Sequence, residues 1–137
     1  MRQILTMSLT LLLAVAMQGQ TYWNGTSNKT FSGSGTQTDP YLISTPEQLA
    51  GLAERTNVDK EDFAGQYIKL TADIYLTDFT NPDTASWKEW TPISGVFWGN
   101  YSEDEMGQLS GPKVDSIAFC GTFDGDGHTI YNVYYGQ

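Results

Sequence analysis

The side chains best suited to hold a metal ion lie in the segment Asp124-Gly125-Asp126-Gly127, near the end of the printed sequence. Two carboxylates and the carbonyl groups of a loop are oxygen ligands of the kind that calcium accepts. An EF-hand loop would also need more ligands and a distant bidentate glutamate, which this segment lacks. The alternative is a tight corner whose glycines take positive φ while Asp124 and Asp126 face water. We expect the corner and keep calcium as the other interpretation.

A second group of residues is suited to bind carbohydrate: Trp87, Trp90, Trp98 and Tyr101. Flat aromatic rings stack on sugar rings, and nearby carboxylates and amides bind the hydroxyl groups. Aromatic side chains also dominate the energetics of small hydrophobic cores, so the same four rings are suited to fill the end of a core. We favour the core and keep carbohydrate binding as the other interpretation.

No set of residues in the sequence specifies a reaction. His128 is the single histidine, which excludes a multi-histidine metal site and a histidine proton relay. Carboxylate pairs such as Asp124 with Asp126, or Asp115 with either, have groups that could act on a glycan, but nothing in the sequence separates their pKa values. We therefore expect a non-catalytic chain that needs no cofactor.

Two short segments are candidates for covalent modification. Asp83-Thr84-Ala85 and Asp115-Ser116-Ile117 resemble the Asp-Ser/Thr-apolar acceptor of O-glycosylation systems in some Gram-negative anaerobes. This resemblance implies glycan attachment at Thr84 and Ser116.

The elements that must position these residues begin with a short strand over 41–43 and a helix near 46–56. Thr45 is a suitable N-cap, Pro46 fits the first helical position, and Gln48 completes a capping-box pattern. The end of the helix is predicted at Asn57, a residue that tolerates left-handed geometry. The apolar stripe of the helix consists of Leu49, Leu52 and Ala53.

Residues 67–76 alternate strictly between apolar and polar side chains, which predicts one strand with a buried face. A Phe-x-Gly-x-aromatic motif begins at Phe63, Phe97 and Phe119, and its last two copies lie 22 residues apart. A recurring motif at such a period is typical of stacked repeats. We therefore predict a mainly β fold, the start of a parallel β-helix (solenoid) with one short capping helix.

The N-terminal residues predict export. One positive charge precedes an apolar run from Ile4 to Ala16, and Ala14-Val15-Ala16 supplies a cleavage site. The run is too short for a comfortable membrane span. We assign 1–16 to a signal peptide, with cleavage as late as residue 20 as an alternative.

The remaining chain divides into a flexible lead-in over 17–38 and one domain over 39–137. The lead-in is rich in Asn, Thr, Ser and Gly and has no apolar period. Within the domain, a polar and aromatic insertion covers about 77–118, where only 90–98 resembles strand.

Charge and cysteine content narrow the classes of partner and location. Sixteen acidic residues against seven basic ones give a net charge of −9, and the basic residues are scattered singly, which argues against nucleic acid. Cys120 is the single cysteine, so it forms no internal disulfide and cannot be the acylated first residue of a lipoprotein. We expect Cys120 to be buried within a strand-like run.

Several segments together resemble the opening of bacterial surface proteins with GLUG-type repeats. The resemblance covers residues 33–133, with Ser94 standing where the family usually has glycine. It implies a right-handed parallel β-helix capped by the helix, in a protein that is secreted or at the cell surface and often adhesin-like. The matching segments are Gly33-Ser34-Gly35-Thr36, Asp39-Pro40-Tyr41-Leu42-Ile43, Thr45-Pro46-Glu47-Gln48-Leu49, Phe63-Ala64-Gly65-Gln66-Tyr67, Asp73-Ile74-Tyr75-Leu76, Trp90-Thr91-Pro92-Ile93 and Gly121-Thr122-Phe123-Asp124-Gly125-Asp126-Gly127-His128.

The family's Gly-Leu-Phe-Gly-like segments would begin where the printed sequence stops, so we expect a truncated N-terminal piece of a longer protein. Its expected function is adhesion or surface display, through contacts with a host or bacterial surface protein or a glycan. The alternative is the N-terminal module of an extracellular enzyme, a polysaccharide lyase, glycoside hydrolase or peptidase, whose catalytic part is missing.

Overall fold

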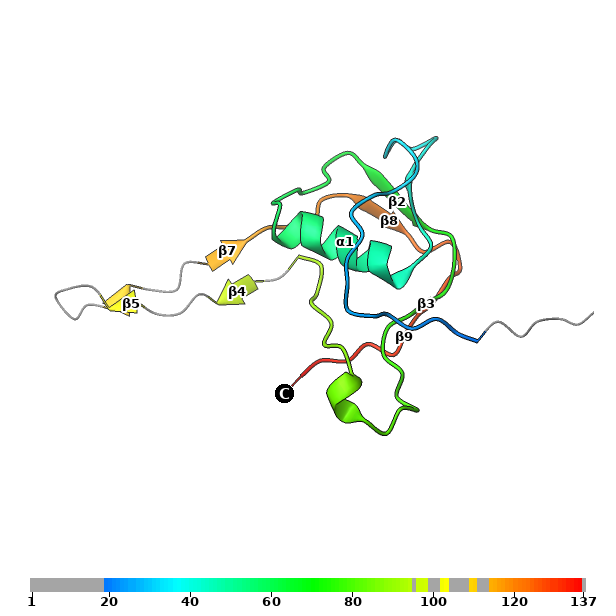
Figure 1. Ribbon diagram of the computed structural model, residues 1–137. Helices are drawn as coiled ribbons and strands as arrows, with labels where there is room; N and C mark the ends of the chain where they lie inside the picture. Colours follow the sequence, from blue (N-terminus) through cyan, green and yellow to red (C-terminus); the bar gives the residue numbers. More distant parts are fainter. Residues whose placement is uncertain (1–18, 95, 99–101, 104–108, 111–113, 137) are drawn as a thin grey trace, which may run out of the picture.

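The computed structural model describes residues 19–94, 96–98, 102–103, 109–110 and 114–136. In this described part the fold is mixed α/β, with small sheets and one α-helix (Figure 1). The predicted signal peptide lies outside the described residues. The elements, in chain order, are β1 (Tyr41–Ile43), α1 (Pro46–Asn57), β2 (Tyr67–Leu70), β3 (Ile74–Tyr75), the 3-10 turn η1 (Thr84–Ser86), β4 (Val96–Trp98), β5 (Ser102–Glu103), β6 (Leu109–Ser110), β7 (Val114–Ser116), β8 (Thr122–Asp124) and β9 (Ile130–Tyr131).

Two of the sheets are parallel and join segments that are far apart in the sequence. One has the order β1-β2-β8, and Ile68 at its centre pairs with Tyr41 on one side and Phe123 on the other. The other sheet pairs β3 with β9, with Ile74 opposite Ile130. The predicted parallel pairing of short strands is confirmed, but no multi-coil solenoid is present among the described residues.

The alternation over 67–76 is confirmed for burial, but the prediction of one continuous strand is wrong. Ile68, Leu70, Ile74 and Leu76 are each at most 1 % exposed. The chain bends at 71–73, and this bend separates β2 from β3. At the bend, the Asp73 carboxylate accepts a hydrogen bond from the backbone N–H of Thr129 at 3.0 Å. The apolar face therefore continues around a corner, so that one segment serves both parallel sheets.

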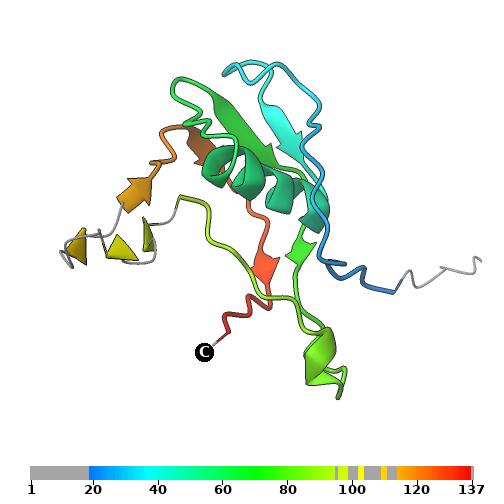
Figure 2. The same ribbon diagram turned by 60° about the vertical axis from the view of Figure 1, so that its left-hand side comes forward.

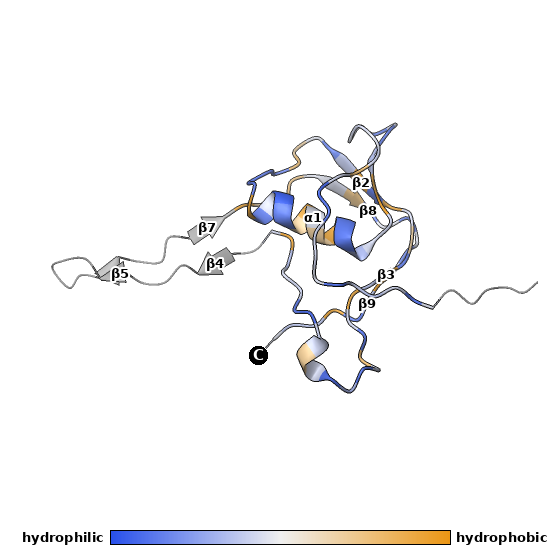
Figure 3. Ribbon diagram, in the orientation of Figure 1, coloured by the Kyte–Doolittle hydropathy of each residue, from blue (hydrophilic) through white to orange (hydrophobic). Residues whose placement is uncertain are grey.

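Helix α1 begins as the sequence predicts. The Thr45 hydroxyl accepts a hydrogen bond from the Gln48 backbone N–H, and Pro46 occupies the first turn. The Gln48 side chain accepts from the backbone N–H of Ser44 at 2.9 Å, one residue before the position that a capping box uses. Leu49 and Leu52 are buried, and Figure 3 shows hydrophobic residues in the middle of the helix between more hydrophilic ends.

The predicted left-handed stop at Asn57 is wrong, because Asn57 stays helical and Val58 after it is also right-handed. The Asn57 side chain has another role. Its Nδ2 donates to the carbonyl of Pro92 at 2.8 Å, and its Oδ1 accepts from the backbone N–H of Ser94 at 3.0 Å. The C-terminal end of α1 is thereby tied to the segment that leads into β4. Among the described residues, no helix has the length and apolar character needed to cross a bilayer.

The described part of the expected flexible lead-in, residues 19–38, is packed against the rest of the fold and runs alongside α1 (Figures 1 and 2). The Trp23 backbone N–H donates to the carbonyl of Tyr75 at 3.0 Å, and that of Asn28 donates to the carbonyl of Glu47 at 2.8 Å. A polar clamp joins Ser27 and Lys29 to Glu54 of α1. The amino-acid composition of this segment is typical of a flexible loop. Composition does not report backbone hydrogen bonds, and these make most of the contacts described here.

The polar clamp predicts a pH dependence of stability. Hydrogen bonds from Ser27 and then from Lys29 lower the pKa of Glu54, so its ionised form favours the folded state. This contribution is complete above the pKa of Glu54 in the unfolded chain and is lost as the pH falls through the lower, folded pKa. We expect Glu54→Gln to lower Tm at pH 7 and to leave Tm at pH 3 nearly unchanged. Melting curves from pH 7 to pH 3 test this, with the exposed Glu89→Gln as control; a loss independent of pH would contradict it.

An arm of antiparallel strands projects from the body (Figures 1 and 2). β4 pairs with β7 and β5 with β6, whereas the sequence predicted strand over 90–98 alone. Phe97 lies in β4, so its motif copy is not equivalent to the other two, and the 22-residue spacing is not the repeat of the fold. The rings of Phe63 and Phe119 do meet, with centroids 5.8 Å apart.

Candidate functional site

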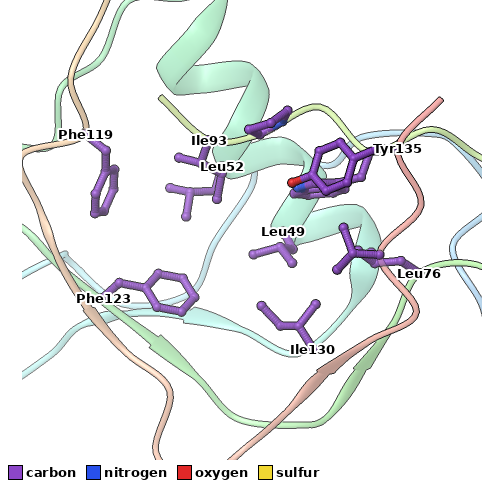
Figure 4. Close-up of a pocket in the computed structure, with 11 residues that line it drawn as sticks. Leu49, Leu52, Leu76, Ile93, Phe119, Phe123, Ile130 and Tyr135 are labelled. Carbon is purple, nitrogen blue, oxygen red and sulfur yellow. The ribbon is translucent and has the colours of Figure 1, made fainter. Parts of the chain in front are cut away.

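An open apolar groove of about 380 Å³ lies between α1 and the strands β8 and β9. Figure 4 shows Phe123 of β8 and Ile130 of β9 on one side and Leu49 and Leu52 of α1 on the other. These side chains lie here because the helix presents its apolar stripe to the inner face of the parallel strands. Six of the residues that line the groove are Leu49, Leu52, Phe119, Phe123, Ile130 and Tyr135.

The groove is open because two rows of apolar side chains, one in each parallel sheet, end beside it. The row in the β3-β9 sheet consists of Ile74 and Ile130. On the inner face, Tyr41, Ile68 and Phe123 occupy matching positions on β1, β2 and β8. Ile68 is 1 % exposed, but Phe123 at the edge of the sheet is 37 % exposed. After β9, Val133 and Tyr135 are 41 % and 55 % exposed. Exposed apolar side chains that gather beside an apolar groove are typical of an interaction surface.

The outer face of the same strands carries an aromatic ladder and a charged one. Tyr22, Tyr75 and Tyr131 lie side by side, and the rings of Tyr75 and Tyr131 stack with centroids 4.6 Å apart. Lys69 pairs in register with Asp124, and its Nζ lies 3.0 Å from a carboxylate oxygen of Asp126. The edge of β8 and β9 therefore differs in chemistry on its two faces.

Contacts around Asp124 and Asp126 support the tight corner. The Asp124 carboxylate accepts a hydrogen bond from the backbone N–H of Asp126 at 2.9 Å, and both Asp126 and Gly127 have positive φ. Lys69 places an ammonium group beside Asp126, where it would compete with a cation. No cluster of three or more metal-binding side chains occurs among the described residues.

Of the four predicted carbohydrate-binding residues, Trp87 and Trp90 have described side chains, and these two lie in different clusters. Trp90 is only 8 % exposed, and its ring packs edge-on against Trp23 at 5.5 Å. Trp87 lies in a different cluster, where its ring centroid is 5.1 Å from that of Phe79 and 5.5 Å from that of Tyr134. Trp98 belongs to β4 of the arm, and Tyr101 is outside the described residues. The burial of Trp90 matches the alternative in which it fills the core.

The remaining predicted residues are placed as follows. Thr84 is exposed in η1, accessible to a modifying enzyme, and Ser116 lies in β7 of the arm. Cys120, which we expected to be buried, is exposed. The reason is that Phe119 turns inward onto Phe63 instead.

A second hollow, about 520 Å³, lies between the lead-in, α1 and Trp90. It is larger than the groove, but the polar side chains at its rim are already engaged within the protein. Glu54 bonds to Ser27 and Lys29, and Asn57 bonds to the chain before β4. We therefore regard the groove beside β8 and β9 as the candidate site.

Searches of family models, curated proteins and solved structures find no match to this chain.

Proposed function

We propose that the chain is a non-catalytic N-terminal module of a secreted or cell-surface bacterial protein, and that it acts in adhesion or surface display. The open edge of β8 and β9, together with the groove, is its contact surface. One observation carries the proposal: Phe123, Val133 and Tyr135 end or follow the buried rows but are themselves well exposed. These residues gather beside an open apolar groove, and contiguous exposed apolar surface of this kind is typical of an interaction site.

In this proposal the two parallel sheets are the first coil of a right-handed β-helix. Support comes from the corner at 71–73, which passes one segment from the β1-β2-β8 sheet to the β3-β9 sheet. The lead-in makes a bridge to each sheet on the side away from β8 and β9, at Tyr22 and at Ser32. One side of the coil is therefore covered, as in the terminal units of repeat proteins, and the other side is the open contact surface.

The proposal is tested by binding of the purified chain to arrays of immobilised glycans and extracellular-matrix proteins. We expect binding to a subset of these without cleavage of the bound molecule. The double variant Val133→Asp/Tyr135→Asp should weaken binding at least tenfold, because two charges would enter the apolar contact. Val58→Asp is the matched control. Val58 is 68 % exposed, but it follows the C-terminal end of α1 and does not line the groove.

Three results would contradict the proposal. They are the absence of binding on every array, binding that the double variant leaves intact, and cleavage of a bound glycan or protein by the purified chain.

A further inference from the structure

We infer that the edge of β8 and β9 accepts an extended polypeptide segment that adds in parallel, with a basic side chain beside Asp124 and an aromatic ring beside Tyr131. The inference rests on the proposed function and specifies the partner of the same surface. A protein segment is thereby favoured over a glycan as the occupant.

Each of the strands β8 and β9 pairs with a neighbouring strand along one edge of its backbone, and its other edge faces away from that neighbour. On β8, the backbone N–H of Thr122 donates to the carbonyl of Gln66 at 2.9 Å, on the side of β2. On β9, the carbonyls of Thr129 and Tyr131 accept from β3 and the residue after it. Because successive residues of a parallel strand bond to opposite sides, the N–H and C=O groups of Phe123 and Ile130 point to the other edge.

That other edge has no partner strand among the described residues, since β8 and β9 each end their sheet. A parallel segment would satisfy these backbone groups, as in known cases of strand addition. A free glycan offers no regular row of donors and acceptors at the spacing of a β-strand.

The inner face selects apolar side chains in the added segment. Phe123 and Ile130 point into the groove, where Leu49 and Leu52 of α1 form the opposite side (Figure 4). A segment that pairs with β8 and β9 would place its own inward side chains over these two residues. The groove volume of about 380 Å³ is enough for a few such side chains.

The outer face selects charge and aromaticity. Lys69 on β2 pairs in register with Asp124 on β8, and Leu42 on β1 stands at the same position. A basic residue in the added segment would lie beside the Asp124 carboxylate on its other side, whereas an acidic one would face Asp124 directly. Tyr75 and Tyr131 are stacked with planes 6° apart, and a further ring would extend the same ladder.

A synthetic copy of residues 67–76 is a suitable probe, because this segment already pairs in parallel with β8 and β9 from their other side. It carries Ile68, Lys69, Ile74 and Tyr75 at the required positions. We expect the peptide to bind the purified chain in titration calorimetry and to slow amide exchange at Phe123 and Ile130. A peptide with Lys69→Glu should bind about fivefold more weakly, and one with Tyr75→Ser likewise. A peptide of reversed order should bind at least tenfold more weakly.

The possible failures are distinguishable. If the peptide binds but ignores the Lys69→Glu and Tyr75→Ser changes, the inferred side-chain pattern is overturned and the strand-accepting edge remains. If no peptide binds, while array binding is still lost in Val133→Asp/Tyr135→Asp, strand addition is overturned and the proposed function remains. If both assays fail, both are overturned.

Discussion

Trp90→Ala is expected to lower the free energy of unfolding by about 3–5 kcal/mol, the range for removing a large aromatic side chain from a core. The Trp90 ring is almost fully buried and packs against Trp23, and it lies against the groove as well as the second hollow. Deleting it would join two spaces that are separate in the protein. Urea unfolding followed by circular dichroism measures the loss.

Trp87→Ala is the matched control, three residues earlier in the chain. Its ring is half-buried and contacts Phe79 and Tyr134 outside the core cluster. We expect this variant to cost about 1 kcal/mol, the order of an aromatic pair contact. Equal losses for the two variants would contradict the assignment of Trp90 to the core.

Gly51→Ala is expected to destabilise the protein by about 2–3 kcal/mol, as overpacking does. In an ordinary helix this change would be favourable by about 1 kcal/mol, because glycine is a poor helix former. Here a β-carbon at Gly51 would lie 2.0 Å from the carbonyl oxygen of Asn28 and 2.9 Å from the backbone nitrogen of Lys29. Both contacts are with backbone, so the lead-in would have to leave the helix.

The loss should appear in Tm and, specifically, in faster amide exchange at Trp23 and Asn28. The control is Gly19→Ala, because a β-carbon there meets nothing within 4 Å and should leave stability within about 0.5 kcal/mol. A more stable Gly51→Ala variant would show that the lead-in does not pack on α1 as described.

Features set by neighbouring residues were predictable from the sequence. The strand at 41–43, the Thr45 cap and the buried face of 67–76 all follow from side chains within a few positions of one another. The position of each motif copy in space does not, because it depends on pairing between distant strands. Phe97 has the same local pattern as Phe63, yet it lies in the arm.

The environment of Arg55 shows what sequence patterns cannot report. Its guanidinium lies 4.8 to 5.4 Å from the ring centroids of Phe31, Tyr41 and Phe63, which come from three separate segments. Hydrogen bonds to Glu61, the shortest at 2.6 Å, raise the pKa of Arg55. No spacing along the chain links these residues, since each ring arrives through the tertiary fold. The positions of β8 and β9 at the edges of their sheets depend on the same tertiary pairing, so no local pattern reports them.

The attachment of the arm has a mechanical consequence. Ser94, at the root of one leg, donates its hydroxyl to the carbonyl of Ile117 at the root of the other, at 2.9 Å. The backbone N–H of Ser94 and the carbonyl of Pro92, two residues earlier, are both hydrogen-bonded to the side-chain amide of Asn57. A pull on the arm is therefore transmitted to the last turn of α1 through one amide group. Under the proposed role at a cell surface, where the arm would meet shear, this route would protect the strand edges from separation.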